Sequence, residues 1–284
     1  DNARSGTTVE NEAESKSASK SELNRKRHMV LLAMNQTGLN NIFKLVSASY
    51  HGDNFYRKPR IDFDLLQQHN EGIIAASACL GGIYAGCYWE HREEGPKAVK
   101  QAMRDITVKM LDIFGDRWYG ELQWNAIPEQ HELNRYVIQM HKEFGIPLIS
   151  TCDSHYPSPD AWNDRELYKK IGWLGKGKPE WMSDELPESV EEIGYELYPK
   201  NGEQMWADYK RYSDLIPTDV AYDDDIVRNS ILETVNIAFE RIEDFLPDNT
   251  VRLPDFVVPA GHHPAEYLAQ LSFEGLFKVL ESRS

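Results

Sequence analysis

Short apolar runs alternate with amphipathic stretches over residues 28–151 of the chain. Four runs have the length and residue types of strands, at 28–35, 71–79, 117–123 and 146–151. Three stretches carry apolar residues three and four positions apart, as helices do, at 37–50, 96–114 and 129–144. Because strands and helices alternate, the pattern predicts an α/β fold of parallel strands with helices outside, either a barrel or an open sheet.

Residues suited to helix ends support these assignments. Thr37 is placed to cap the first helix, and Gly115 and Gly145 follow the last apolar positions of the next two. Further along the chain, we expect another amphipathic helix over residues 226–245. An extended segment over 253–268 and a last helix should complete the chain.

Composition changes the picture in two stretches. Residues 1–27 contain only five aliphatic residues, so we expect a flexible polar segment there. Residues 184–225 hold 13 acidic and 3 basic residues, a balance of −10. We interpret the second stretch as a solvated surface with two or three helices, and an acidic binding surface is the alternative.

The net charge of −15 argues against a broad basic surface that grips phosphates directly. It leaves room for a phosphate substrate held through metal ions, because bound cations reverse the local charge. The three cysteines, Cys79, Cys87 and Cys152, do not suggest a disulfide framework in a chain of 284 residues. These cysteines favour a reducing cytoplasm, so we expect a cytoplasmic protein. With no run of 18 apolar residues, we expect no membrane span.

The candidate chemistry begins with Asp153 and His155, which follow the predicted strand at 146–151. Alternate side chains of a strand share a face, so Asp153 and His155 should point the same way as Thr151, and Cys152 the other way. In parallel α/β folds functional groups gather at the carboxyl ends of strands, and a carboxylate with an imidazole suits Zn²⁺ or Mn²⁺. The alternative is that Asp153 only caps the turn that follows.

Other strand ends carry further donors. Cys79 closes the predicted strand at 71–79 and is either a thiolate ligand or a small buried apolar residue. His28 opens the first predicted strand and is either a ligand or an ordinary core or surface histidine. Glu121 is a general base, a partner that orients a metal ligand, or a structural carboxylate. We place His131 and His141 on the surface and Cys87 in the core, and the residues alone assign no catalytic group.

Six segments together resemble one known family. They are HMVLLAMNQTGLNNIFKLVSASY (28–50), FYRKPRIDFDLLQQHNEGIIAASACLGG (55–82), FGDRWYGELQ (114–123), GIPLISTCDSHY (145–156), YPKNGEQM (198–205) and VRLPDFVVPAG (251–261). Their order is similar to that in the PHP (polymerase and histidinol phosphatase) domain of bacterial or phage DNA polymerase III alpha subunits. The resemblance covers most of residues 28–280.

The resemblance implies a (βα)7-like PHP barrel over residues 28–215, without its N-terminal part, followed by a helical and extended connector over 216–284 that leads toward a polymerase core. It implies a site for Zn or Mn ions formed by four family ligand positions: His28, Cys79, Asp153 and His155. The remaining family ligands should precede His28, and nothing in residues 1–27 supplies them.

The implied activity is a metal-dependent 3′–5′ exonuclease or phosphoesterase inside a DNA-directed DNA polymerase, whose own Mg-binding carboxylates lie beyond this chain. The implied partners are DNA, through the parent polymerase, and a sliding clamp and other replisome subunits. Two alternatives stay open. The domain is a degenerate PHP scaffold that only stabilises the polymerase, or it is a free-standing PHP phosphatase. The polymerase-like segments make the phosphatase the least favoured of the three functions.

Overall fold

A computed structural model describes residues 26–56, 58–174, 186–213, 222–251 and 256–283. The chain divides into two compact units, Asp1–Phe245 and Leu246–Ser284, which are treated separately below. Nearly all of the predicted flexible segment at 1–27, and the predicted boundary between residues 215 and 216, lie outside the described residues.

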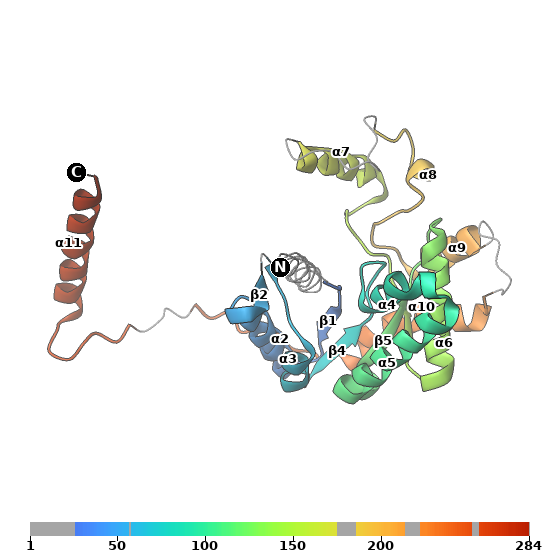
Figure 1. The fold of residues 1–284 in the computed structure, drawn as a ribbon, viewed down its shortest axis with the longest axis horizontal. Helices are drawn as coiled ribbons and strands as arrows, with labels where there is room; N and C mark the ends of the chain where they lie inside the picture. Colours follow the sequence, from blue (N-terminus) through green and yellow to red (C-terminus); the bar gives the residue numbers. More distant parts are fainter. Residues whose placement is uncertain (1–25, 57, 175–185, 214–221, 252–255, 284) are drawn as a thin grey trace, which may run out of the picture. The chain divides into compact units, whose positions relative to one another are not determined.

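The first unit is built on a four-stranded sheet in the order β1-β4-β5-β6 (Figure 1). Its strands are β1 (Val30–Ala33), β4 (Ile73–Ala76), β5 (Trp118–Leu122) and β6 (Leu148–Ser150). All four predicted strands exist, and β4, β5 and β6 are parallel as expected. The expectation is wrong for β1, which pairs with β4 in the antiparallel direction, with Val30 opposite Ala76. A closed barrel of seven such units stays a prediction.

Helices connect and cover these strands. In the first unit they are α2 (Gln36–Ser49), α3 (Phe63–Gln68), α4 (Ile83–His91), α5 (Pro96–Phe114), α6 (Pro128–Phe144), α7 (Trp162–Trp173), α8 (Val190–Ile193), α9 (Gly202–Ser213) and α10 (Asp224–Asn236). A two-stranded ribbon of β2 (Phe55–Tyr56) and β3 (Lys58–Pro59) follows α2. Because helix and strand alternate along the parallel part of the sheet, the α/β class is confirmed.

Local sequence explains where the helices begin and end. Pro96 and Pro128 occupy the first turns of α5 and α6, where proline's missing N–H costs nothing. Gly145 ends α6 in the left-handed conformation, with φ 71°. The predicted cap of α2 is wrong, because Asn35 rather than Thr37 caps it, and its side-chain oxygen accepts a hydrogen bond from Gly38 N at 3.1 Å.

The last predicted elements differ from the structure in their bounds. The helix expected over 226–245 is α10, which ends at Asn236 and continues as a π-helical turn over Ile237–Arg241. In the second unit, α11 (Pro264–Arg283) begins inside the stretch expected to be extended over 253–268. Proline at the first helical position starts α11 there.

The hydrophobic core lies on both faces of the sheet. On one face, Trp118 and Leu122 of β5 belong to the larger buried cluster, which includes Met103 of α5 and Val137 of α6. On the other face, a smaller cluster has as its buried members Ile74, Ala76, Tyr119, Ile149 and Ile237. Glu121 lies two residues after Tyr119, so its side chain projects from the same face as the smaller cluster.

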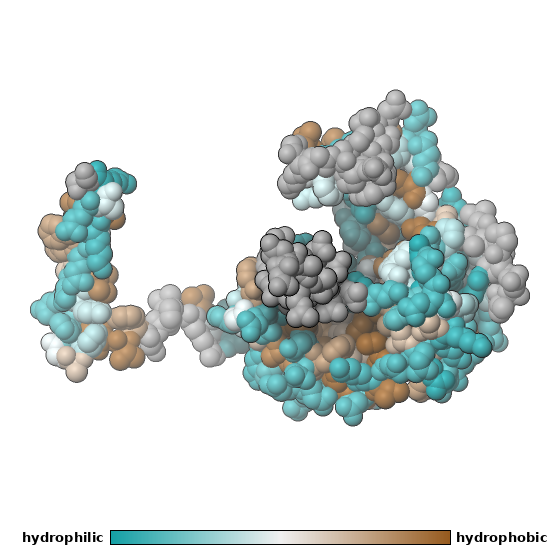
Figure 2. Space-filling view, in the orientation of Figure 1, coloured by the Kyte–Doolittle hydropathy of each residue, from teal (hydrophilic) through white to brown (hydrophobic). Residues whose placement is uncertain are grey.

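The second unit contains the helix α11, none of whose residues is buried. Apolar side chains lie on its surface, among them Leu268, Phe273 and Phe277 (Figure 2). Among the described residues, none of the helices combines the length and the apolar character needed to cross a membrane.

His131 is buried, which corrects its predicted place on the surface. Its Nε2 donates a hydrogen bond to the Asn125 carbonyl at 2.7 Å, and the Tyr222 hydroxyl lies 2.9 Å from Nδ1. The imidazole therefore links the loop after β5 to the residues before α10. Burial lowers the pKa of His131, because an imidazolium at this position would lose its hydration.

This lowered pKa predicts a pH-dependent contribution to stability. Below the usual histidine pKa of about 6.5, the unfolded chain binds a proton at residue 131 that the folded chain does not. The free energy of unfolding should therefore decrease as the pH is lowered from 7.5 to 5.5. The decrease is at most about 1.4 kcal/mol for each unit by which the pKa of His131 is lower in the folded than in the unfolded chain. Urea unfolding of wild type and His131→Gln at both pH values measures this contribution, and an equal loss in the two proteins would contradict it.

Candidate functional site

The strand directions bring the predicted site residues to one end of the sheet. Cys79 and Asp153 follow the carboxyl ends of the parallel strands β4 and β6. His28 precedes β1, but β1 runs antiparallel to β4, so the beginning of β1 lies beside the end of β4. A bridge between His28 and Gly82 and a 2.8 Å hydrogen bond from His28 N to the Gly81 carbonyl fix this neighbourhood.

Cys79 lies in a tight turn after β4. Ala78, just before it, has φ 60°, which is uncommon for a residue with a side chain. Gly81 N donates to the Cys79 sulfur at 3.5 Å. A Cβ on Gly81 would lie 2.9 Å from His28 Nδ1, so glycine at this position leaves room for the imidazole beside the thiol.

The thiol of Cys79 and the imidazole of His28 are in contact, with 3.7 Å between Sγ and Nδ1. A tetrahedral zinc ion bonded to both would hold sulfur and nitrogen about 3.6 Å apart. The donor types and their spacing therefore fit a shared metal ion of the zinc class.

Asp153 reaches the same place from β6. Its carboxylate lies close enough to the Cys79 thiol to contribute to the raised pKa of that thiol. The predicted alternation of side chains across residues 151–155 is wrong, because β6 ends at Ser150 and Asp153 has φ 47°. A turn in the backbone, rather than a continuing strand, therefore carries Asp153 to Cys79.

Glu121, at the end of β5, joins the two loops that carry Cys79 and Asp153. Only 4% of its surface is exposed. Its Oε1 accepts a hydrogen bond from Ala78 N at 2.7 Å, and its Oε2 accepts one from the Thr151 hydroxyl, also at 2.7 Å. Each carboxylate oxygen thus holds a different strand end, one residue before Cys79 and two residues before Asp153.

Two acidic groups in this cluster, Glu121 and Cys79, have raised pKa values. Burial raises the pKa of Glu121, and the nearby charge of Asp153 raises it further. Burial also raises the pKa of the Cys79 thiol, and the same Asp153 carboxylate adds to that shift. A cation bound here would reverse both effects, because it stabilises carboxylate and thiolate forms.

His155 is exposed, and its ring contacts the backbone of Asp153. Its Nδ1 donates to the Asp153 carbonyl at 2.6 Å, which leaves the lone pair on Nε2. Within the part of the chain that the structure describes, its ring makes no hydrogen bond with His28 or Cys79. The structure therefore brings His28 into contact with Cys79 and Asp153 near that thiol, whereas the His155 ring bonds to the Asp153 backbone.

These contacts do not yet make a complete site. In the described ranges, no set of three or more His, Cys, Asp and Glu side chains is arranged to hold one metal ion. His28 contacts Cys79, and Asp153 lies near Cys79, but the three donors do not surround a common point.

The acidic segment that precedes and includes α9 supports the loop of Asp153. His155 N donates to the Leu197 carbonyl at 2.7 Å, and Leu197 N donates to the Tyr156 hydroxyl at 2.7 Å. These bonds attach residues 196–200 to the loop after β6. Part of the acidic stretch over 184–225 is thus a packed support for the candidate site.

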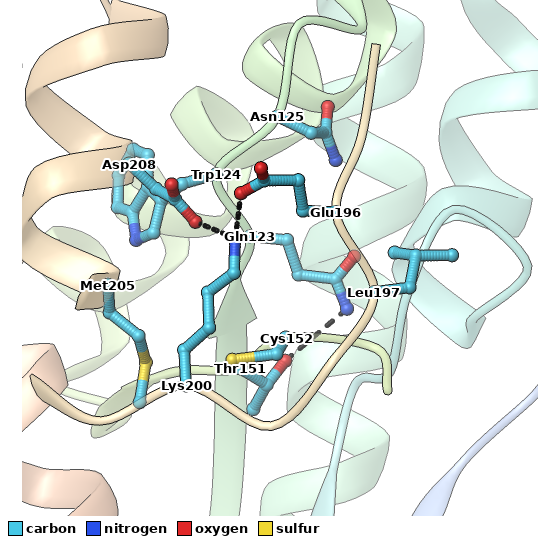
Figure 3. Close-up of a pocket in the computed structure, with 10 residues that line it drawn as sticks. All are labelled: Gln123, Trp124, Asn125, Thr151, Cys152, Glu196, Leu197, Lys200, Met205 and Asp208. Atoms are coloured by element: carbon cyan, nitrogen blue, oxygen red, sulfur yellow. Dashed lines mark hydrogen bonds and ion pairs between the residues drawn. The ribbon is translucent and has the colours of Figure 1, made fainter. Parts of the chain in front are cut away.

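Lys200 anchors this support beside a small polar cavity of about 20 Å³ (Figure 3). Its side chain is 3% exposed and forms ion pairs with Glu196, at 2.9 Å, and with Asp208. Cys152 and Thr151 line the same cavity. Burial lowers the pKa of Lys200, but hydrogen bonds to the two carboxylates outweigh it and leave the pKa raised.

Comparison with known proteins identifies the framework around these residues. Residues 4–125 match the PHP domain family. The chain contains a PHP domain. The match includes His28, Cys79 and Glu121, and it ends before Asp153 and His155.

Similar proteins extend the likeness beyond the matched PHP region. The chain is 32% identical over 258 residues to the DNA polymerase III alpha subunit of Aquifex aeolicus, covering 89% of this chain and 20% of that protein. It is 32% identical to that of Borreliella burgdorferi over 90% of this chain, and 31% identical to that of Thermus aquaticus over 94%, in each case with 20% of the relative covered. The chain spans about a fifth of the length of these relatives and is homologous to that segment of them.

The sequence left the role of Glu121 in the candidate site open and missed that of Lys200. The bridging role of Glu121 depends on Ala78 and Thr151, which lie 43 and 30 residues away from it. The sequence signal for a special role of Glu121 was its position as the one charged residue in the otherwise apolar run WYGEL. Lys200 gave no signal, because a lysine in an acidic stretch is ordinary on a solvated surface.

Burial of Lys200 predicts a large effect of its removal. Lys200→Met should lower the free energy of unfolding by about 3–5 kcal/mol, because Glu196 and Asp208 would lose their shared cation. Lys210→Met is the matched control, since the Lys210–Asp224 pair is about half exposed on both sides. Urea unfolding of the two variants compares them, and equal losses would show that Lys200 does not anchor the loop support.

Proposed function

We propose that this chain is the PHP-domain segment of a DNA polymerase III alpha subunit and that its strand-end cluster binds divalent cations for hydrolysis of phosphodiesters from a DNA 3′ end. The observation that carries the proposal is the contact between His28 and Cys79, with Asp153 near the same thiol, at one end of the sheet. Likeness to polymerase subunits over about nine tenths of the chain supports DNA as the substrate class.

In this proposal His28, Cys79, Asp153 and His155 hold the ions. A thiolate and an imidazole favour Zn²⁺, and carboxylate oxygen also suits Mn²⁺. When bound, such ions would supply a hydroxide at neutral pH and neutralise the phosphodiester. The proposal requires Asp153 and His155 to complete the His28–Cys79 pair when a cation binds.

The chain's own residues prepare this chemistry in three ways. Glu121 fixes the loops that present Cys79 and Asp153. The hydrogen bond from His155 Nδ1 to the Asp153 carbonyl orients the ring. It leaves the lone pair of Nε2 available to bind a metal ion, as in many metal-binding histidines. The segment at 196–200 holds the backbone of His155.

A structural role without hydrolysis is the second candidate. It is favoured by one observation, that three donors in the described residues do not meet at a common point. In that case the PHP domain would only stabilise the polymerase. Polymerisation itself would use Mg²⁺ bound elsewhere in the parent protein. In the cytoplasm, the parent protein would bind DNA, a sliding clamp and other replisome subunits.

Replacing Asp153 separates these candidates. In the full-length parent protein, Asp153→Ala should abolish Mn²⁺-dependent 3′–5′ exonuclease activity, because one proposed ligand is lost, and should leave primer extension largely intact. Asp160→Ala is the control, since Asp160 is an exposed carboxylate seven residues further along. The assay follows a 3′-labelled primer with and without nucleotides.

Two outcomes would contradict the proposal. Exonuclease activity that survives Asp153→Ala unchanged would remove Asp153 from the ligand set. A wild-type parent protein that binds no Zn or Mn and degrades no DNA would favour the scaffold.

A further inference from the structure

Glu121 is a buried carboxylate whose bonded partners are both uncharged. Among the described residues, the hydrogen bonds of its oxygens come from the Ala78 amide and the Thr151 hydroxyl, and no Lys or Arg forms an ion pair with it. By contrast Glu166, which is similarly buried on α7, pairs with Arg165 and Lys169. A buried charge without an opposite charge is costly, so its presence needs a compensating role.

We infer that Glu121 is the positioning residue of the proposed metal site: its carboxylate sets the distance between the Cys79 turn and the Asp153 loop and supplies negative charge beside the bound cation. This inference rests on the proposed function. It assigns Glu121 no bond to the metal, because each of its oxygens is already engaged by a strand end.

The two bonded groups explain why a carboxylate is needed. An N–H from Ala78 and an O–H from Thr151 are both donors, and a carboxylate accepts through both oxygens. A glutamine amide accepts through one oxygen only, so the Thr151 hydroxyl would have to rotate and accept from the NH₂ group instead of donating. Glu121→Gln should therefore weaken the link to one loop and remove the negative charge while changing the side-chain volume very little.

The backbone around Glu121 makes this position sensitive. Ala78 and Asp153 are the two residues with side chains that adopt positive φ in the described structure, at 60° and 47°. Such conformations persist where surrounding contacts hold them. Glu121 bonds to Ala78 itself and to Thr151, two residues before Asp153, so it contributes directly to holding both.

The test uses Co²⁺ as a probe in place of zinc. Bonding of Co²⁺ to a thiolate produces a near-ultraviolet absorption band, and the wild-type chain should show this band, with Cys79→Ala abolishing it. Glu121→Gln should weaken Co²⁺ affinity about 10–100-fold, as loss of groups that orient ligands does. Glu166→Gln, which also removes a buried carboxylate's charge, should leave the affinity unchanged.

The outcomes separate this inference from the proposed function. A wild-type chain without a Cys79-dependent band overturns the proposed site, and the inference with it. A wild-type band with unchanged affinity in Glu121→Gln overturns the inference alone.

A milder variant covers the case in which Glu121→Gln does not fold. Thr151→Val keeps the carboxylate and removes one of its two donors. It should weaken Co²⁺ affinity in the same direction and by a smaller factor, and an unchanged affinity would overturn the positioning role.

Discussion

The candidate site depends on one buried carboxylate that spans three strands. Glu121 projects from β5 and accepts hydrogen bonds from the residue before Cys79 and from a residue just before Asp153. It adds a direct link between the two loops, since β4 and β6 each pair with β5 and not with one another. Because the carboxylate is buried, its bonds are stronger than they would be in water, and losing one would leave a donor unsatisfied.

Sheet topology supplies the remaining donor. His28 precedes its strand, and in a wholly parallel sheet it would lie at the end opposite to Cys79. The antiparallel direction of β1 reverses this and places the imidazole 3.7 Å from the thiol. Gly81 is the complementary requirement, because a side chain there would meet the imidazole. One reversed strand and one glycine therefore decide whether the His28–Cys79 pair can form.

Much of the fold could be predicted from sequence because it depends on local periodicity. The four strands, α5, α6 and the glycines that follow those helices were confirmed, since alternation and helix-ending residues act within a few positions. The direction of β1 could not be read in this way, because strand pairing is a long-range property. The burial of His131 escaped for the same reason: its partner Tyr222 lies 91 residues away.

The sequence predicted which residues belong to the candidate site better than it predicted how they are arranged. Recognising donor residues at strand ends, together with the family resemblance, selected His28, Cys79 and Asp153, and the structure places all three at one end of the sheet, with His28 in contact with Cys79. The alternation argument failed for Asp153 and His155 because the chain leaves the strand at Ser150. The bond between Glu121 and Thr151 joins two strands whose register no local pattern specifies.

Anomalous X-ray diffraction from crystals of the full-length protein soaked in Zn²⁺ or Mn²⁺ tests the central claim most directly. The account predicts an anomalous peak about 2.0–2.3 Å from both the Cys79 sulfur and the His28 imidazole, with Glu121 still bonded to Ala78 and Thr151 rather than to the ion. A peak bound by Glu121 itself, or no peak near Cys79, would contradict it.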